Sequence, residues 1–248
     1  MESVKTALRV LELVGEAGQA GVSDLARAIG EPKTTVQRNL VTLHEAGWIR
    51  PVEDGKRRRW TLSPRVLLLA RRLQPVERLR SQALAIMERL RDRTQETIHL
   101  TLRDGALVVL IERLDSPRTL RTVRQLGDAA QLHMNSTGKS ILAHLPEAEQ
   151  AAYLRRRLGA PTPRTLASPE ALARDLALIR QRGFAFNDGE LDLEVRAVGA
   201  PIRLETGEPI AAISISCPAA RLPDALVEDY GALVREAAAE ISRRLVSA

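Results

Sequence analysis

The sequence predicts an α+β protein of two domains, the first of them a winged helix-turn-helix. Over the first 62 residues the predicted elements run helix, helix, helix and hairpin, which is the order of that fold. Further along, two hairpins enclose a group of helices, a pattern typical of an antiparallel sheet with helices packed on it. At 248 residues the chain is long enough for two domains. We expect a winged domain over residues 1–63, a linker helix over 64–74 and an α+β domain over 75–248.

The first two helices are predicted from apolar spacing and end signals. Apolar residues at helical spacing predict one amphipathic helix over residues 3–17. Ser23 is the expected N-cap of a second, short helix, and Gly30 is expected to end it. Pro32 suits the start of a third helix, where a missing N–H costs nothing. The expected apolar face of the first helix consists of Val4, Leu8, Leu11 and Val14.

The third helix is expected to expose a polar face. Val36, Leu40 and Leu43 follow an i, i+4, i+7 spacing that must face a core. The residues turned outward are donors and small hydroxyls, which can reach phosphates and base edges in a major groove. An ordinary helical hairpin with a solvated face is the alternative for this stretch taken alone. The outward residues are Lys33, Thr34, Thr35, Gln37, Arg38 and Thr42.

A basic hairpin follows and favours the DNA-binding interpretation. Strands are predicted over residues 48–52 and 58–62, with a turn at Glu53, Asp54 and Gly55. The hairpin has four consecutive positively charged residues. A strand edge exposed to solvent rarely needs so many like charges, whereas a wing lying along a phosphate backbone does. These cations are Lys56, Arg57, Arg58 and Arg59.

The charge distribution also indicates a nucleic-acid-binding segment. Residues 1–72 contain 13 Lys or Arg against 8 Asp or Glu, whereas the rest of the chain contains 24 against 23. A basic protein that binds membranes should also contain a strongly amphipathic basic helix, which we do not find. Six aromatic residues offer little surface for stacking single-stranded bases, so double-stranded DNA is the expected partner.

Several other classes are disfavoured by composition. Cys217 is the single cysteine, so neither an internal disulfide nor a thiolate-rich zinc site is expected. The sequence has no signal peptide and no apolar run of about 18 residues, so we expect a cytoplasmic protein without a membrane span. The four histidines are dispersed, and most are expected to be structural.

The rest of the chain is predicted in order as follows. Ser63 and Pro64 begin a helix over residues 66–73, and Pro75 interrupts it before a longer helix over 76–93. Strands over 97–102 and 106–114 flank an Asp104-Gly105 turn, and 120–123 is a further candidate strand. A second hairpin is expected over 198–204 and 209–217. Helices are expected over 136–144, 147–158, 169–182 with Ser168 as cap, and 223–245.

The stretch from His133 to Ser140 is a candidate binding site. Asn135 or Ser136 would cap a helix whose free N–H groups can hold an anion, and Gly138 would let a ligand approach the backbone. Met134 and Thr137 lie in the same stretch, which suggests a site for a small carboxylate. A simple capped helix is the alternative.

Two further groups of polar residues lie near the end of the chain. Ser214 and Ser216 share one strand face, where buried hydroxyls need partners that a polar ligand could supply. The acidic run is either a solvated loop or a source of general acid/base groups, and its spacing fits no metal motif. No phosphate-binding loop, nucleophile elbow or zinc-protease motif occurs, so we expect no catalytic residue, metal or cofactor. The acidic run contains Asn187, Asp188, Glu190, Asp192 and Glu194.

Taken together, these segments resemble the IclR-type bacterial transcriptional regulators over nearly the whole chain. The similar stretches are residues 3–13, 32–38, 94–97, 132–133 with 138–139, 162–165, 183–190 and 213–216, in that order. The resemblance implies a GAF-like effector-binding domain, dimers formed through the winged domains, and often tetramers. It further implies an effector pocket lined by Asn135 to Gly138, Asn187, Asp188, Ala197, Ser214 and Ser216.

Two pocket positions depart from that family's pattern. Ala197 stands where the family often has cysteine, and Asn187 stands where an acidic residue is common. Both changes make the expected pocket less polar or less charged.

We therefore expect a regulator that binds double-stranded DNA and senses a small organic acid or related metabolite. Its DNA contacts are expected from Ser23, the outward residues of the third helix and the four cations of the hairpin. One alternative is a small-molecule enzyme with an accessory winged domain, in which Asp188 or Glu190 acts as a base. Another is a sensor of a different winged family that binds a sugar phosphate.

Overall fold

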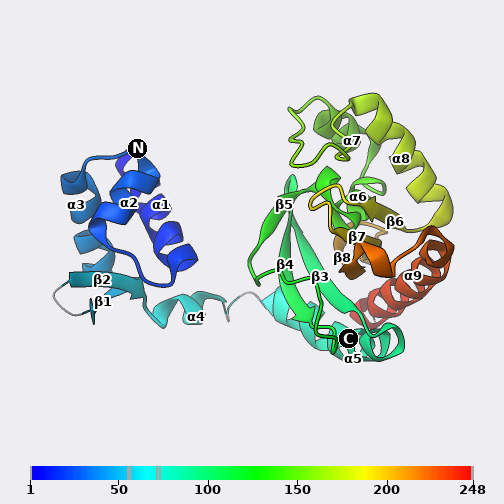
Figure 1. Cartoon of the computed structure of the whole chain (residues 1–248), viewed down its shortest axis with the longest axis horizontal. Helices are drawn as coiled ribbons and strands as arrows, with labels where there is room; N and C mark the ends of the chain where they lie inside the picture. Colours follow the sequence, from blue (N-terminus) through cyan, green and yellow to red (C-terminus); the bar gives the residue numbers. More distant parts are fainter. Residues whose placement is uncertain (1, 55–56, 71, 73, 247–248) are drawn as a thin grey trace. The chain divides into compact units, whose positions relative to one another are not determined.

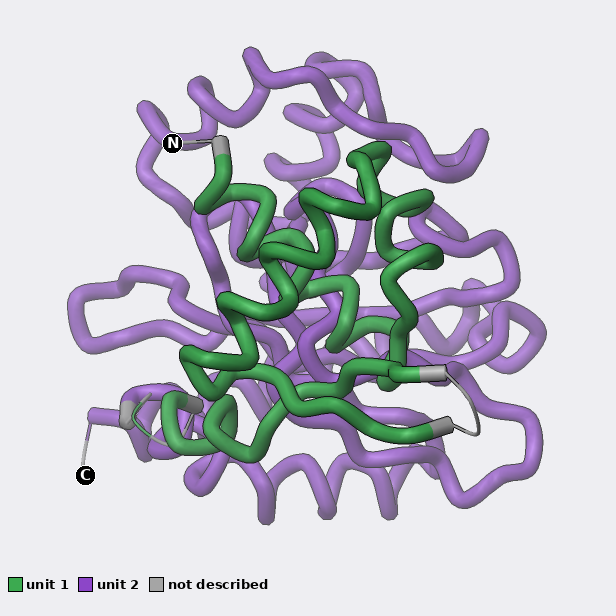
Figure 2. Tube along the Cα trace, turned by 90° about the vertical axis from the view of Figure 1, so that its left-hand side faces the viewer, with its two compact units in different colours: residues 1–74 green, residues 75–248 purple. Residues whose placement is uncertain are grey.

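The computed structural model describes residues 2–54, 57–70, 72 and 74–246. The chain divides into two compact units, Met1–Gln74 and Pro75–Ala248 (Figure 2). Unit 1 contains α1 (Glu2–Ala17), α2 (Val22–Ile29), α3 (Lys33–Glu45), the hairpin of β1 (Ile49–Asp54) and β2 (Arg57–Leu62), and α4 (Arg65–Ala70) (Figure 1). This order confirms the winged helix-turn-helix. Lys56 and Gly55 of the predicted wing lie outside the described residues.

The core of unit 1 is built from α1, α2, α3 and the hairpin. It contains the predicted stripe of α3, Val36, Leu40 and Leu43, together with Trp60 of β2. The predicted face of α1 was partly wrong, because Val4 and Leu8 are exposed. Val14 is buried as predicted, together with Val10 four residues before it, so the buried face is rotated from the predicted one.

The start of α2 also differs from the prediction. Gly21 occupies the N-cap position in an extended conformation, and no side chain caps the helix. The backbone of Ala20 exchanges two hydrogen bonds with Trp60, at 2.9 and 2.8 Å, and so fixes the chain just before the helix. Ser23 therefore lies inside α2 as an exposed residue and is not the N-cap.

Unit 2 is a six-stranded antiparallel sheet with helices on both faces, which confirms the α+β fold class. The strand order is β5-β4-β3-β8-β7-β6. The pairing of β3 with β8 joins the two predicted hairpins, which are β3–β4 and β7–β8. The strands are β3 (Thr97–Asp104), β4 (Leu107–Leu114), β5 (Ala129–Gln131), β6 (Ala185–Asp188), β7 (Val195–Arg203) and β8 (Pro209–Pro218).

The helices of unit 2 fall into two groups. The long helices α5 (Gln74–Thr94) and α9 (Asp224–Val246) pack on the apolar face of the sheet, where β8 contributes Ile213 and Ile215. The other face receives α6 (Ser136–Leu142), which packs with α7 (Glu147–Leu154) and α8 (Pro169–Arg182) around a second core (Figure 1). Two short 3₁₀ turns, Leu132–Met134 and Ala219–Arg221, complete the unit.

Some element boundaries were predicted incorrectly. Residues 120–123 do not form a strand, and β5 and β6 were not predicted. Both missed strands are edge strands of three or four residues, too short to show an alternating pattern. Pro75 does not interrupt a helix. It lies in the first turn of α5, where its missing N–H removes no hydrogen bond of the helix. Ser168 is confirmed as a cap, and of the two candidates Asn135 and Ser136 it is Asn135 that caps α6. The Ser63 hydroxyl accepts a 3.1 Å hydrogen bond from the Arg65 N–H at the start of α4.

Two glycines allow α6 to lie directly on the sheet and on the turn before it. A Cβ at Gly199 of β7 would come within 2.9 Å of the Ser136 backbone. A Cβ at Gly138 would come within 2.2 Å of the Leu132 carbonyl oxygen. All seven residues of α6 are buried. Its position therefore depends on backbone contact on both sides.

Candidate functional site

The outer face of α3 presents the polar side chains expected from the sequence. Lys33, Thr34, Gln37 and Arg38 are exposed, whereas Thr35 is half-buried. Thr42 is also exposed, but its hydroxyl donates a 3.0 Å hydrogen bond to the Arg38 carbonyl of its own helix. Within α3, four donor-bearing side chains are thus free to reach a partner.

The arginines of the hairpin differ in their surroundings. Arg58 is exposed and its guanidinium lies 4.7 Å from the ring centroid of Trp60. Arg59 is half-buried and donates a 3.0 Å hydrogen bond to the Gln19 carbonyl, so it also has a structural role. Arg57 belongs to β2, opposite Asp54.

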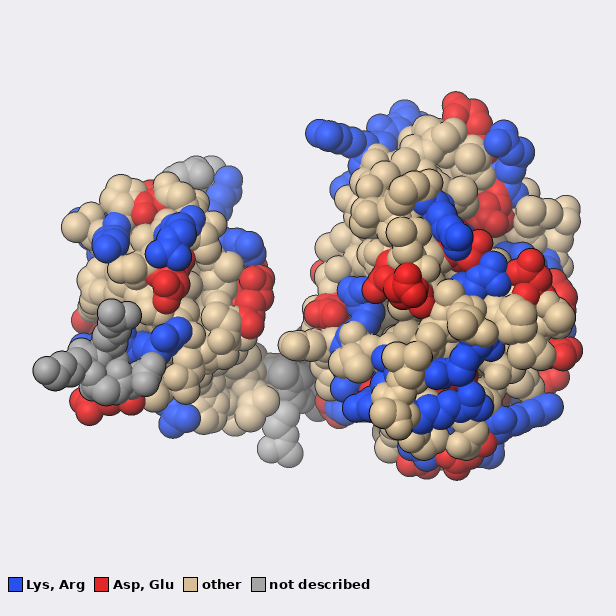
Figure 3. All heavy atoms as spheres, viewed as in Figure 1, with Lys and Arg blue, Asp and Glu red and all other residues tan. Residues whose placement is uncertain are grey.

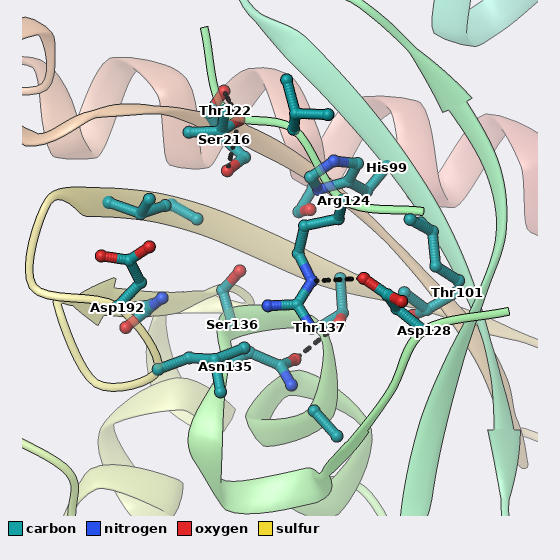
Figure 4. Close-up of a pocket in the computed structure, with 18 of the residues that line it drawn as sticks. His99, Thr101, Thr122, Arg124, Asp128, Asn135, Ser136, Thr137, Asp192 and Ser216 are labelled. Atoms are coloured by element: carbon teal, nitrogen blue, oxygen red, sulfur yellow. Dashed lines mark hydrogen bonds and ion pairs between the residues drawn. The ribbon is translucent and has the colours of Figure 1, made fainter. Parts of the chain in front are cut away.

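Unit 2 contains a cavity of about 430 Å³ on the polar face of the sheet (Figure 4). Its floor is formed by side chains of β3, β4, β7 and β8, and its wall by the start of α6. A segment of residues 115–128, here called the strap, and residues 191–195 also line it, as do Ala130, Asn187 and Pro218. The floor and wall residues that line it are His99, Thr101, Val108, Leu110, Asn135, Ser136, Thr137, Ala197, Ser214 and Ser216.

Seven of the ten predicted effector residues line this cavity. They are Asn135, Ser136, Thr137, Asn187, Ala197, Ser214 and Ser216. The other three, Met134, Gly138 and Asp188, do not belong to its lining.

The structure explains why two of these residues, Gly138 and Asp188, lie elsewhere. Gly138 faces the Leu132 backbone, so its missing side chain makes room for the protein itself and not for a ligand. Its N–H is taken by the Asn135 side chain at 2.8 Å. Asp188 accepts hydrogen bonds from Arg196 at 2.5 Å and Arg164 at 3.0 Å. These bonds, led by that from Arg196, lower the pKa of Asp188.

The strap and two polar residues of β3 line the cavity without having been predicted from the sequence. The strap contributes Leu120, Arg121, Thr122, Val123, Arg124 and Asp128. It is held against the floor by the Thr122 hydroxyl, which lies 3.3 Å from the Ser216 hydroxyl. His99 and Thr101 alternate with the buried Ile98 and Leu100, and that alternation could have identified them. No local pattern in the strap indicates that it crosses a cavity.

A buried ion cluster holds α6 against β6 and α8. The Lys139 side chain is 1% exposed, and its ammonium lies 2.8 Å from Asp175 and 2.6 Å from Glu190. It also donates a 2.7 Å hydrogen bond to the Phe186 carbonyl. Burial raises the pKa of Glu190 to about 7, although Lys139 opposes this shift. Glu190 is therefore part of the structural support of α6.

Within the described residues, no three His, Cys, Asp or Glu side chains are grouped so that they could hold a metal ion. No described helix is both long and apolar enough to cross a membrane. The surface of unit 2 visible in Figure 3 has positive and negative side chains interspersed.

Comparison with known proteins identifies relatives along the whole chain. Residues 75–243 match the family model described as bacterial transcriptional regulator IclR C-terminal, and residues 3–53 match the IclR helix-turn-helix domain. The chain is 31% identical to the transcriptional repressor IclR of Escherichia coli over 246 residues, covering 98% of this chain and 89% of the repressor. It is 30% identical to the regulator KdgR of Escherichia coli, covering 98% and 94%.

Solved structures agree with the sequence relatives. The IclR protein of Thermotoga maritima has a TM-score of 0.76 and 31% identity, with 99% of each chain covered. An IclR homologue of Microbacterium hydrocarbonoxydans, solved in complex with 4-hydroxybenzoate, has a TM-score of 0.83 and 27% identity. That alignment covers 99% of this chain and all of the homologue.

The raised pKa of Glu190 predicts a pH-dependent stability. Because the folded carboxyl group titrates near 7 instead of 4.5, its contribution is fully present below pH 4.5 and is lost as pH rises through 7. Glu190→Gln has no such loss. The free energy of unfolding of the wild type relative to Glu190→Gln should therefore fall by up to about 3 kcal/mol between pH 5 and pH 8.

Urea unfolding followed by far-UV circular dichroism measures this difference, because both tryptophans lie in unit 1 and fluorescence would follow the wrong unit. Glu228→Gln, at an exposed residue of α9, is the matched control and should show a constant difference from wild type. A constant difference for Glu190→Gln as well would contradict the assigned environment of this carboxyl group.

Proposed function

Because this chain belongs to the IclR family of bacterial transcriptional regulators, we propose that α3 reads double-stranded operator DNA and that a small carboxylic acid in the cavity modulates this binding. The observation that carries the proposal is the division of α3 into two faces. Val36, Leu40 and Leu43 are buried, and the donors of the opposite face are exposed. An amphipathic helix of this kind can insert its polar face into a major groove.

Base reading and phosphate binding are assigned to different residues. Gln37 and Arg38 near the middle of α3 are suited to base edges, and Lys33 and Thr34 at its start are suited to base edges or phosphates. Arg58, exposed on β2, is suited to the phosphate backbone, and Lys56 and Arg57 belong to the same proposed wing. Arg59 contributes in part by holding β2 near Gln19. Ser23 and Thr42, both exposed, complete the proposed contacts.

The proposed effector site is the cavity of unit 2. The hydroxyl groups of Ser136, Ser214 and Ser216 can donate hydrogen bonds to a carboxylate without the burial of a second full charge. The Thr137 and Thr122 hydroxyls also line the cavity, but they already donate to Asn135 and Ser216. A relative with the same fold was solved with 4-hydroxybenzoate, which is a carboxylate of suitable size. Both findings support a small organic acid as the ligand.

The proposed assembly is a homodimer formed through the winged units, or a tetramer of two such dimers. Exposed apolar side chains on α1 and α4 of unit 1 support this assembly, because a monomer gains nothing from exposing them. These residues are Val4 and Leu8 on α1 and Leu67, Leu68 and Leu69 on α4. Such a DNA-binding protein would work in the cytoplasm, where bacterial DNA is found.

The alternatives to this function receive less support. The relatives are named as repressors and regulators, not as enzymes, and this chain is likewise a regulator and not an enzyme. Asp188 and Glu190, the bases of the enzyme alternative, are engaged by Arg196 and Lys139. The family assignment also replaces the alternative of another winged family that binds a sugar phosphate.

The coupling between ligand and DNA is proposed to pass through α4. At the start of α4, Ser63 donates a 2.6 Å hydrogen bond to the Gly47 carbonyl, and Arg65 donates one of 2.6 Å to the Ala46 carbonyl. Ala46 and Gly47 directly follow α3. A displacement of α4 would therefore move the end of α3 and, in a dimer, change the spacing of the two recognition helices.

The roles of Gln37 and Arg58 predict two different losses on DNA. Gln37→Ala should relax the preference at one base pair, costing about 1–3 kcal/mol on operator and little on random DNA. Arg58→Ala should weaken binding to all duplexes and reduce the slope of log affinity against log salt by about 1. Fluorescence anisotropy at several salt concentrations, with an operator selected by the wild type, measures both.

Arg174→Ala, at an exposed residue of α8, is the control and should leave affinity and salt slope unchanged. Equal losses on operator and random DNA from Gln37→Ala would exclude a base-reading role for that residue.

The proposed ligand site predicts stabilisation by carboxylates that depends on Ala197. A ligand at 100 times its dissociation constant should stabilise the folded wild type by about 2.7 kcal/mol and raise its melting temperature. Ala197→Leu, which adds three carbons on the cavity floor, should abolish this shift for benzoate and 4-hydroxybenzoate. Ala152→Leu, at an exposed residue of α7, should retain it. The same shift in both variants would place the ligand outside the cavity.

A further inference from the structure

His99 differs from the other histidines because its imidazole has no hydrogen-bond partner in the described part of the chain. His44, His133 and His144 each bond to a backbone carbonyl, at 3.1, 2.8 and 2.8 Å respectively. His99 is 7% exposed, and its buried Nε2 atom has no partner among the described residues. Its side chain lines the cavity (Figure 4).

An unpartnered buried nitrogen is costly, so it indicates a missing partner. More than 90% of buried polar groups in proteins form hydrogen bonds, and leaving one unsatisfied is destabilising. No described side chain bonds to this nitrogen. Thr101, two residues along the same face, donates its hydroxyl to the Ala212 carbonyl at 3.4 Å. Because His99 lines the cavity, a ligand group can supply the bond.

His99 lies on the part of the cavity floor that is remote from α6. Gly199, Ser214 and His99 form one row across β7, β8 and β3. Neighbouring strands are about 4.8 Å apart, so the ends of this row are separated by about 10 Å. Ser136 lies on Gly199, at one end, and His99 is at the other. A ligand that contacts both must therefore carry polar groups at two separated positions.

The charges around His99 favour an uncharged ligand group at this end. Burial, with Arg124 and Arg113, lowers the pKa of His99 to about 4, so the imidazole is neutral at physiological pH. Arg113 is paired with Asp115 at 2.7 Å and Arg124 with Asp128 at 3.4 Å. Arg121, also in the lining, lies 4.0 Å from Asp115. A second carboxylate would therefore have to compete with Asp115 and Asp128 for these arginines, whereas an uncharged hydroxyl or carbonyl group needs no balancing charge.

The charged residues at the far rim of the cavity also disfavour a ligand with two carboxylates. They are Asp192 and Glu194, and neither has a cationic partner among the residues described. Their negative charge also opposes a dianion.

We propose that the effector is a carboxylic acid with a second, uncharged hydroxyl or carbonyl group at the end remote from its carboxylate, and that His99 selects for this group. The inference rests on the proposed function, in which the carboxylate is bound near Ser136. A neutral imidazole has one donor and one acceptor, so it can bind either a hydroxyl or a carbonyl. Acids that lack the second group leave Nε2 unsatisfied and bind more weakly.

Isothermal titration of the full chain with matched ligand pairs tests this selectivity. The pairs are 4-hydroxybenzoate against benzoate and 5-hydroxypentanoate against pentanoate, with terephthalate as the dicarboxylate. At pH 7.5 the wild type should prefer the hydroxylated member of at least one pair about tenfold or more, equivalent to about 1.4 kcal/mol. His99→Phe should reduce the preference to less than about twofold without weakening the unsubstituted acid.

Two further variants keep the test informative. His99→Gln retains a donor and an acceptor and should retain part of the preference, which also covers the case in which His99→Phe does not fold. His144→Phe makes the same substitution at a histidine outside the cavity lining and should keep the full preference.

The outcomes distinguish this inference from the proposed function. Binding of the acids with no preference in the wild type, or with an unchanged preference in His99→Phe, overturns the role of His99 alone. Tightest binding of terephthalate overturns the uncharged second group. If no acid of the panel binds the wild type, the result contradicts the proposed carboxylate effector and, with it, the role of His99.

Discussion

The position of α6 on the polar face of the sheet determines where the cavity lies. Backbone contact at Gly199 and Gly138 brings the helix close, and the buried Lys139 binds it to Asp175 and Glu190. Because α6 has seven residues, it covers only part of that face. The hydroxyl-bearing floor beyond it, on β3 and β8, remains uncovered by any helix and is enclosed by the strap. Fixed backbone contacts thus provide a preformed site.

This arrangement favours ligand recognition by hydrogen bonds over recognition by net charge. The arginines of the strap and of β4 have acidic partners, and the serine and threonine hydroxyls of the lining are neutral. A site of this type discriminates strongly against ligands that leave its polar groups unsatisfied. The net positive charge of the chain is instead concentrated in residues 1–72, where it can act on DNA phosphates. Electrostatic attraction to DNA is thus a property of unit 1, and selectivity for a ligand through hydrogen bonds is a property of unit 2.

The sequence predicted features that are encoded locally. Helical spacing identified the buried face of α3, the Asp104-Gly105 turn identified a hairpin, and Asn135 was one of two residues expected to cap α6. It could not predict the cluster around Lys139, because Asp175 and Glu190 are 36 and 51 residues away along the chain. The strap was not predicted for a different reason, because an irregular segment has no periodic sequence pattern. Gly138 was misinterpreted because a glycine required by close backbone packing looks the same in sequence as one required by a ligand.

The central claim is that one ligand site and one DNA site are energetically coupled in this chain. Such coupling is reciprocal, so the most direct measurement is a closed thermodynamic cycle with the tightest-binding carboxylate of the panel and the selected operator. The account predicts that the ligand changes operator affinity by a factor of about 5–150, and that the operator changes ligand affinity by the same factor. Operator affinity that is identical with and without saturating ligand would contradict it.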